Sequence, residues 1–335
     1  MKEAMFYKTV RDDIVQCELC PQFCVLKPGG RGKCHVRENK DGKLVSLVYA
    51  KPCSIAIDPV EKKPLFHFFP GSKTFSISTV GCNLDCKACQ NWEISQANPE
   101  DVSAKEMQPE EVVAEALKHN CESISYTYIE PSIFYEYVLD IAKLARQKGL
   151  KNIMVTNGFL NPEPIQELYQ YIDAANIDLK SFSDDFYKEM CEGRLQPVLD
   201  AIKQIKKMGV WIELTTLIIP GQNDNPEEIR NMCKWIKANA GADTPIHFSR
   251  FFPCYKLLNI EPTPIDTLRD CYEIATEVGL KYIYVGNVLD THFHQTVCPK
   301  CGMEVIDRSP RYELEEVHLE NGACKFCKTK IAGVF

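Results

Sequence analysis

The sequence predicts an α/β fold in which a parallel sheet is wound partway into a (β/α)6-type barrel. Three observations support this fold class. From about residue 73, short apolar runs alternate with longer helical patterns, which is typical of β-α-β units. Polar or turn-forming residues follow the expected strands, as they do at the catalytic end of such a barrel. Closely spaced cysteines break the pattern at both ends of the chain, so we expect a small module at each end.

The chain of 335 residues divides into three expected parts. Residues 1–70 are rich in Cys, Gly and Pro and predict an irregular N-terminal Cys-rich module. Residues 71–290 carry the alternating pattern of the barrel, and residues 291–335 predict a C-terminal four-Cys metal-binding module. The length suits one large domain or two to three smaller ones.

The barrel segment contains apolar runs of strand length separated by amphipathic runs of helix length. The expected strands are residues 74–79, 123–126, 152–155, 174–178, 211–218, 246–251 and 282–285. The expected helices are residues 109–119, 132–147, 164–171, 195–207, 226–240 and 265–278. In this arrangement the loops after the strands converge on one face, where chemistry takes place.

The composition argues against several classes of function and predicts a cytoplasmic protein. A formal net charge of −7 argues against a general nucleic-acid binder, which is usually basic. The first residues lack the apolar core of a signal peptide. The sequence contains no run of about 18 apolar residues, so no membrane span is expected. Seventeen cysteines without an export signal indicate metal ligands or buried thiols in a reducing compartment. The isolated cysteines are expected to be buried thiols: Cys53, Cys121, Cys191, Cys233, Cys254 and Cys271.

Three cysteines follow the first expected barrel strand in the spacing C-x3-C-x2-C. They are Cys82, Cys86 and Cys89. Thiolates this close together usually share a metal or a cluster. A closed zinc or iron–sulfur site takes four ligands, so three cysteines leave one position open for another molecule. The alternatives are a zinc knuckle that lacks one ligand, or three thiols that are close by chance.

Polar residues at the ends of later strands are candidates for binding a ligand on the same face. They are Glu130, Asn157, Asp178, Lys180 and Arg250. A carboxylate suits a cationic amine, and an arginine suits an anion. The alternatives are structural: an acid at a helix start, a turn at Asn157, and ordinary ion pairs.

Two further groups of four cysteines can each close around a metal. Cys298, Cys301, Cys324 and Cys327 form two C-x2-C knuckles, which predict a zinc site or a rubredoxin-like mononuclear iron site. Cys17, Cys20, Cys24 and Cys34 also supply four ligands, and their spacing fits either zinc or an auxiliary iron–sulfur cluster. Unmetallated thiols are the alternative at both sites. His292 and His294 are expected at the surface or on the substrate side rather than as metal ligands.

The C-x3-C-x2-C motif at this position resembles the signature of radical S-adenosylmethionine (SAM) enzymes. The resemblance implies a 4Fe-4S cluster held by Cys82, Cys86 and Cys89, with SAM bound to the fourth iron. It further implies reductive cleavage of SAM to a 5′-deoxyadenosyl radical, which abstracts hydrogen from an unidentified substrate. Glu130 stands where many relatives bind the SAM ammonium. Ala88 replaces an aromatic residue often found before the third cysteine, and Ile129 replaces a glycine.

The chain is also similar to pyruvate formate-lyase activating enzyme. Thr156-Asn157-Gly158 and Asp178-Leu179-Lys180 match its strand-end motifs, which implies that Asn157, Asp178 and Lys180 lie in the SAM and cation region. The departures are Val155, which replaces an aspartate that helps to bind a monovalent cation, and Glu213, which replaces an arginine. These departures indicate a different substrate side.

The motifs Cys17-x2-Cys20-Pro21, residues 58–65 and residues 89–95 look like the radical SAM member of the AmmeMemoRadiSam system. This resemblance implies Memo-like and AMMECR1-like proteins as partners, beside an electron donor such as ferredoxin or flavodoxin. The leading interpretation is a radical SAM enzyme, with SAM either consumed or regenerated. An activase for a glycyl-radical enzyme is the first alternative. A non-catalytic iron–sulfur or zinc scaffold that docks the partner proteins is the second.

Overall fold

The computed structural model describes residues 1–335 apart from the side chain at position 291. Its main sheet is built from Ser54–Pro59 (β7), Lys73–Ser78 (β8), Ser123–Tyr126 (β9), Lys151–Thr156 (β10), Ala174–Asp178 (β11), Trp211–Ile218 (β12), Ile246–Arg250 (β13) and Ile283–Gly286 (β14). The strand order is β14-β13-β12-β11-β10-β9-β8-β7. Strands β8 to β14 pair in parallel, and β7 pairs antiparallel with β8 at one edge. The predicted α/β fold with a parallel-sheet core is therefore confirmed.

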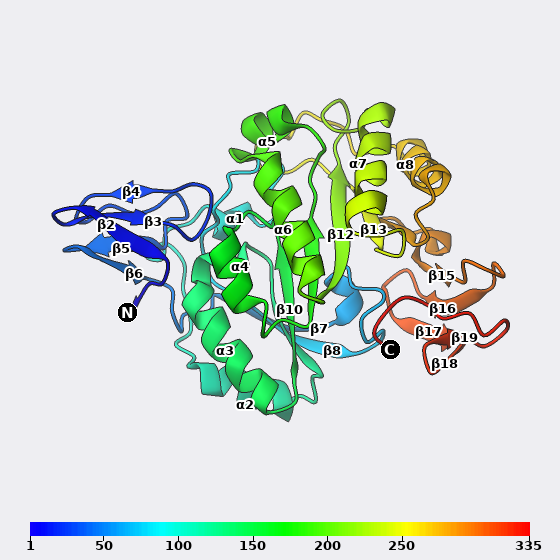
Figure 1. The fold of residues 1–335 in the computed structure, drawn as a ribbon, viewed down its shortest axis with the longest axis horizontal. Helices are drawn as coiled ribbons and strands as arrows, with labels where there is room; N and C mark the ends of the chain where they lie inside the picture. The colour runs from blue at the N-terminus through cyan, green and yellow to red at the C-terminus, as the bar shows by residue number, and fades with distance from the viewer.

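The helices between the parallel strands lie on one face of the sheet. They are α1 (Trp92–Ser95), α2 (Pro109–Lys118), α3 (Tyr135–Gln147), α4 (Pro162–Leu168), α5 (Asp184–Cys191), α6 (Leu195–Lys207), α7 (Pro226–Asn239) and α8 (Ile265–Val278). Three 3-10 turns also occur: η1 (Val60–Lys62) after β7, η2 (Pro131–Phe134) before α3, and η3 (Thr291–His294) after β14. Each strand is added beside the previous one, and right-handed crossovers then place every helix on the same side. Figure 1 shows α3, α4, α6 and α7 along one side of the strands.

The segment after β7 covers the opposite face of the sheet. Ile177 faces α6, because a Cβ added to Gly158 would contact Ile177, Val198 and Ala201 together. Side chains alternate along a strand, so Asn176 faces the other way. Its amide donates to the carbonyl of Pro64 at 2.9 Å. The 60–66 segment is thereby fixed across the face that carries the candidate site.

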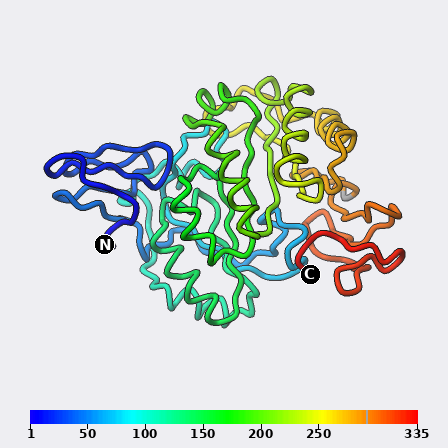
Figure 2. Tube along the Cα trace, in the orientation of Figure 1, coloured from blue at the N-terminus to red at the C-terminus, as the bar shows by residue number. Residues whose placement is uncertain are grey.

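Small strands form a module at each end of the main sheet. The N-terminal strands are β1 (Lys2–Glu3), β2 (Tyr7–Arg11), β3 (Ile14–Cys17), β4 (Val25–Leu26), β5 (Arg37–Lys40) and β6 (Lys43–Ser46), in the sheets β1-β6-β5 and β2-β3-β4. The C-terminal strands are β15 (Thr296–Val297), β16 (Glu304–Arg308), β17 (Leu314–Val317), β18 (Leu319–Glu320) and β19 (Ala323–Cys324). Figure 2 shows the two modules at opposite ends of the molecule.

Buried charged side chains attach both modules to the main sheet. Arg37 of β5 pairs with Glu136 of α3, and both side chains are buried. Arg308 of β16 donates to the carbonyl of Phe66 at 2.6 Å. A lone buried charge is costly, so these contacts fix where each module sits.

The predicted strands of the barrel segment all occur, with ends that shift by at most one residue. Helix α5 was not predicted, although Ser183 caps it by accepting from the amide of Phe186. The boundaries 1–70, 71–290 and 291–335 remain a prediction. Strand β7 lies inside the first of these ranges, yet it pairs with the main sheet. None of the helices in the described part of the chain has the length and apolar character that crossing a membrane requires.

Candidate active site

The Cys82–Cys89 loop follows β8 at the carboxyl edge of the parallel sheet. The end of α5 holds it on both sides of Cys86: the amide of Asp85 donates to the carbonyl of Cys191 at 3.0 Å, and that of Lys87 to Met190 at 2.9 Å. Two backbone bonds around one cysteine fix the direction of that thiol. The structure therefore presents the triplet on a restrained loop.

Asparagine side chains attach the same loop to the end of β10. Asn83 donates to the carbonyl of Phe159 at 2.8 Å. Asn157 donates to Asn83 Oδ1 at 2.8 Å and approaches Cys82 Sγ at 3.9 Å. Asn157 therefore lies beside the triplet, as predicted, and acts there on the loop itself.

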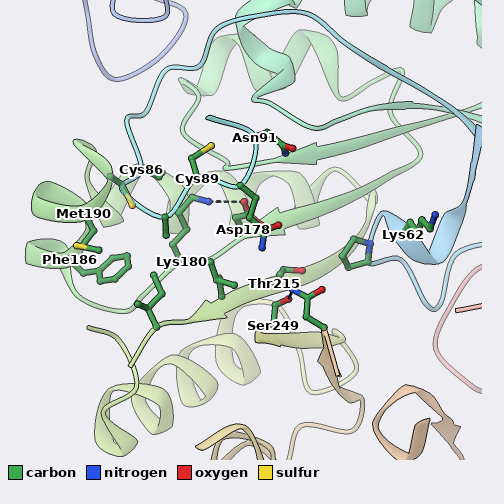
Figure 3. A pocket seen from close by; sticks show the side chains of 17 residues that line it. Lys62, Cys86, Cys89, Asn91, Asp178, Lys180, Phe186, Met190, Thr215 and Ser249 are labelled. Carbon is green, nitrogen blue, oxygen red and sulfur yellow. Dashed lines mark hydrogen bonds and ion pairs between the residues drawn. The ribbon is translucent and has the colours of Figure 1, made fainter. Parts of the chain in front are cut away.

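A cavity of about 350 Å³ opens beside the triplet at the carboxyl edge of the sheet. Figure 3 shows Cys86 and Cys89 above Asp178 and Lys180, with Lys62 at the far end. Lys180 Nζ lies 2.7 Å from Asp178 Oδ2. The structure thus brings together four of the predicted residues, two sulfurs and one ion pair, around one space.

The electrostatics of this cavity favour a charged lysine beside the sulfurs. Burial lowers the pKa of Lys180, but Asp178 and Cys86 outweigh it and hold that pKa well above its ordinary value. A bond with the Cys191 thiol lowers the pKa of Cys86, whereas burial raises the pKa of Cys82. The three sulfurs therefore lie in different electrostatic surroundings, with the charged Lys180 nearest to Cys86.

A second cavity of about 260 Å³ adjoins the first. The two share the lining residues Lys62, Pro64, Thr215, Ser249 and Asn287. The second is closed by aromatic side chains from three distant segments, Phe66, Tyr128 and Tyr312. A ligand that begins at the triplet can extend into this aromatic chamber.

An ion pair fixes one wall of the second cavity. Lys63 Nζ lies 2.7 Å from Asp58 Oδ2 and sits 4.6 Å from the centre of the Tyr128 ring. The Tyr128 hydroxyl donates to the same carboxylate at 2.7 Å. Burial raises the pKa of Asp58, but the hydrogen bonds from Lys63 and Tyr128 lower it by more. The net pKa is therefore below its ordinary value, and the carboxylate stays ionised. The wall is thus a preorganised, charged surface.

Glu213 is the centre of a buried network behind this chamber. It accepts from the amides of Phe66 at 3.0 Å and His67 at 2.8 Å, and lies 2.7 Å from His247 Nε2. Burial raises the pKa of Glu213, but His247 and the other donors lower it overall. Glu213, which replaces an arginine of pyruvate formate-lyase activating enzyme, thus holds the 60–66 segment on the sheet.

The buried His67 predicts that stability falls in mildly acidic solution. Its Nδ1 lies 2.6 Å from the carbonyl of Ala332 and its Nε2 lies 2.6 Å from the Tyr284 hydroxyl, an arrangement that suits a neutral ring. Burial lowers the pKa of His67 from 6.5 to about 4. Between pH 6.5 and pH 4, His67 is therefore protonated in the unfolded chain but stays neutral in the native state. We expect a loss of about 3 kcal/mol as the pH falls through this window.

Urea unfolding of the wild type and of His67→Gln at several pH values measures this effect. The difference between the two proteins cancels titrations that they share. Stability should decline more steeply in the wild type between pH 6.5 and pH 4. Parallel curves across this window would show that His67 does not titrate as its burial requires.

Glu130 and Arg250 do not line either cavity. Glu130 is buried and accepts from Thr156 Oγ1 at 2.9 Å and from the amide of Asn157 at 2.7 Å. Arg250 donates to the carbonyl of Thr263 at 2.8 Å. The structure accounts for both side chains by contacts within the protein, so their predicted contacts with SAM stay predictions.

The C-terminal cysteines converge on one point. The sulfurs of Cys298, Cys301, Cys324 and Cys327 all lie within 4.8 Å of one another, with the pairs Cys298–Cys327 and Cys301–Cys324 at 3.6 and 3.7 Å. This group is suited to a single metal ion. His294 lies elsewhere, buried against Tyr312, and His292 is exposed.

The sequence analysis missed several residues that line the site. Cys191, which was expected to be a lone buried thiol, lines the cavity next to Cys86. Tyr312 reaches the second cavity from the C-terminal module. No local pattern reveals either contact, because each depends on packing between segments far apart in the chain.

Comparison with known proteins finds the Radical SAM superfamily over residues 76–236. An uncharacterized protein of Methanocaldococcus jannaschii is 46% identical over 332 residues, which is 99% of each chain. The pyruvate formate-lyase-activating enzyme of Clostridium pasteurianum is 25% identical over 177 residues, covering 50% of this chain and 71% of that enzyme. A putative glycyl-radical enzyme activating enzyme of M. jannaschii is 29% identical over the same length, with 50% and 70% covered.

The fold is also similar to that of solved structures. Streptococcus suis SuiB bound to S-adenosylmethionine aligns with a TM-score of 0.51 at 14% identity, covering 68% of this chain and 53% of SuiB. This likeness concerns the fold. The family match includes the triplet, the end of β8 and the strands from β9 to β12, which contribute most of the lining of the cavity described above.

Proposed function

Because the chain belongs to the radical SAM superfamily, whose members use a 4Fe-4S cluster and SAM, we propose that Cys82, Cys86 and Cys89 hold that cluster. The protein is an enzyme of this superfamily with an α/β fold. We propose that the curved sheet is its partial (β/α)6-type barrel and that SAM occupies the cavity beside the triplet. With one electron from an external donor, a bound cluster and SAM would supply a 5′-deoxyadenosyl radical, with release of methionine, for hydrogen abstraction from the substrate.

One observation carries this proposal. Cys86 and Cys89 line the same cavity as the Asp178–Lys180 ion pair, at the carboxyl edge of the sheet. Three thiols leave one ligand position open, and the cavity provides room for a molecule of drug-like size at that position. The donor set of three sulfurs on a restrained loop therefore fits the group that the family uses.

The residues of the chain would bind and orient the ligands. Lys180 and Asp178 present opposite charges, which suit the carboxylate and amino groups of SAM. Asn157 keeps Cys82 and the loop in place. Phe186 and Met190 line the cavity on the α5 side, and they would exclude water from the reacting atoms. We propose that the adjoining aromatic chamber receives the substrate.

Replacing Lys180 by methionine is expected to raise the Kd for SAM by about 10- to 100-fold. The ion pair that faces the triplet is lost, while the three sulfurs and their loop remain. Equilibrium binding to the reconstituted, unreduced protein measures this change, and iron content should stay at the wild-type value. Lys188→Met on the exposed side of α5 is the matched control. Unchanged affinity in Lys180→Met would remove this residue from the SAM site.

An activase for a glycyl-radical enzyme is the second candidate. Two of the relatives are activating enzymes by name and align over half of this chain. A glycine-centred EPR signal on a partner protein, formed after incubation with SAM and reductant, would favour the activase. A scaffold that only docks partners is the third possibility, and it predicts no 5′-deoxyadenosine under any condition.

We further propose membership of the AmmeMemoRadiSam system, with Memo-like and AMMECR1-like partners and a ferredoxin or flavodoxin as electron donor. The motifs at residues 17–21, 58–65 and 89–95 support this assignment. The proposed location is the cytoplasm. At the C-terminal cysteines we propose a single tetrahedral metal ion, zinc or mononuclear iron, because the two sulfur–sulfur distances match the edges of a tetrahedron of about 3.8 Å that metal–sulfur bonds of about 2.3 Å define.

A further inference from the structure

The four N-terminal cysteines surround a small closed cavity. Cys17 ends β3, Cys20 and Cys24 lie in the loop before β4, and Cys34 lies in the turn before β5. All four line a cavity of about 20 Å³, together with the apolar side chains of Leu19 and Ile133. The fold therefore collects thiols from separate turns around one enclosed space.

This space is wider than a site for a single zinc ion. A tetrahedral zinc site places its sulfurs about 3.8 Å apart and leaves no room between them. The C-terminal group shows this spacing, with all sulfurs within 4.8 Å of one another. Within the described residues, the N-terminal group does not meet that spacing. A cavity of about 20 Å³ accepts one water-sized atom, which needs roughly 10–15 Å³, whereas a closed zinc site has no such space between its sulfurs, so a centre larger than a single zinc ion fits better.

The protein also supplies donors to these sulfurs. The amide of Lys33 donates to Cys24 Sγ at 3.4 Å, and Arg37 Nη1 donates to Cys17 Sγ at 3.7 Å. Arg37 is held in place by its buried pair with Glu136. Hydrogen bonds to the cysteine sulfurs are a means by which proteins stabilise and tune iron–sulfur clusters.

The N-terminal group lies directly against the triplet loop. A Cβ added to Gly81 would stand 2.3 Å from the carbonyl of Cys34, and Gly81 has a φ of +97°, so glycine is required there. Asn83, next to Cys82, lines the cavity of the N-terminal cysteines. Gln22 joins the two loops by donating to the carbonyl of Asn83 at 2.9 Å.

We propose that Cys17, Cys20, Cys24 and Cys34 hold a second iron–sulfur cluster of the 4Fe-4S type, packed against the loop of the first. All four ligands come from the protein, so this cluster has no open position for SAM. The site is separate from the proposed SAM chemistry, because none of its cysteines lines the cavity beside Cys86.

Anaerobic reconstitution of the variant Cys82→Ala/Cys86→Ala/Cys89→Ala tests this proposal. Iron, acid-labile sulfide and zinc are measured per chain. The variant should keep about four iron and about four sulfide, and adding Cys20→Ser and Cys24→Ser should remove both. The proposal would be overturned if the triple variant contained no sulfide and bound a second zinc ion in addition to one at the C-terminal site.

The full-length wild-type protein gives a second measurement that does not depend on the folding of a variant. It should contain about eight iron atoms and about eight sulfide ions per chain. If zinc filled the N-terminal site instead, both numbers would be about four. Two adjacent clusters, both reduced, should also give an EPR spectrum that differs from the sum of the single-cluster variants. A wild type with about four iron and two zinc contradicts the proposal, whatever the outcome of SAM cleavage.

Discussion

Replacing Cys86 by alanine is expected to lower the release of 5′-deoxyadenosine from SAM by about three orders of magnitude or more. Cys86 faces the cavity and lies between the two backbone bonds that tie the loop to α5. Two remaining thiols cannot hold the proposed cluster, and the open ligand position is lost with it. Chromatographic detection of 5′-deoxyadenosine after anaerobic reduction with dithionite measures the effect.

Cys121→Ala is the matched control for this experiment. Cys121 is buried two residues before the start of β9, outside all three cysteine groups. The control should release 5′-deoxyadenosine at a rate close to the wild type. Undiminished release by Cys86→Ala would remove that cysteine from the cluster site.

Loss of the metal proposed for the C-terminal cysteines is expected to unfold residues 296–335 and to open the second cavity. This segment has a small core, in which Cys298 and Cys324 pack with Val305 and Ile331. A module of this size depends on its metal, which contributes about 10 kcal/mol or more in isolated structural zinc sites. Cys324→Ser should therefore lose the ion, together with the ordered positions of Tyr312 and Arg308.

Hydrogen–deuterium exchange of the amides in β16 and β17 measures this unfolding. Exchange should become fast in Cys324→Ser and in the wild type treated with a chelator, while α3 and β10 stay protected. Cys271→Ser, a buried cysteine of α8, is the control and should exchange like the wild type. Slow exchange of β16 in Cys324→Ser would show that the module folds without its ion.

Local patterns predicted strands β8 to β14 because each of these segments carries its own signal, whereas strand β7 and helices α1 and α5 were not predicted. The apolar runs and the helical spacing are properties of short segments, and the parallel pairing followed from their alternation. The triplet stood out for the same reason, since three cysteines lie within eight residues. Asp178 and Lys180 line the same cavity because strand ends meet at one edge of a parallel sheet, and their role in binding SAM stays a prediction.

The rest of the site depends on contacts that no local pattern records. Glu130 stands at the right strand end, yet its oxygens are taken up by Thr156 and Asn157 from β10 and the loop after it. Cys191 comes to Cys86 only through the packing of α5 against the triplet loop. Tyr312 reaches the chamber from the far end of the chain. The fold determines which oxygens already accept hydrogen bonds and which thiols face a cavity. The spacing of residues in the sequence does not show this.

The central claim is that the triplet leaves one ligand position open and that SAM takes it. Electron–nuclear double resonance on the reduced protein, with SAM labelled by 13C at its carboxylate, tests this claim most directly. A hyperfine coupling between the label and the reduced cluster is expected in the wild type, and none is expected in Cys82→Ala/Cys86→Ala/Cys89→Ala. A fully reduced wild type that shows no coupling, at SAM concentrations far above its Kd, would contradict it.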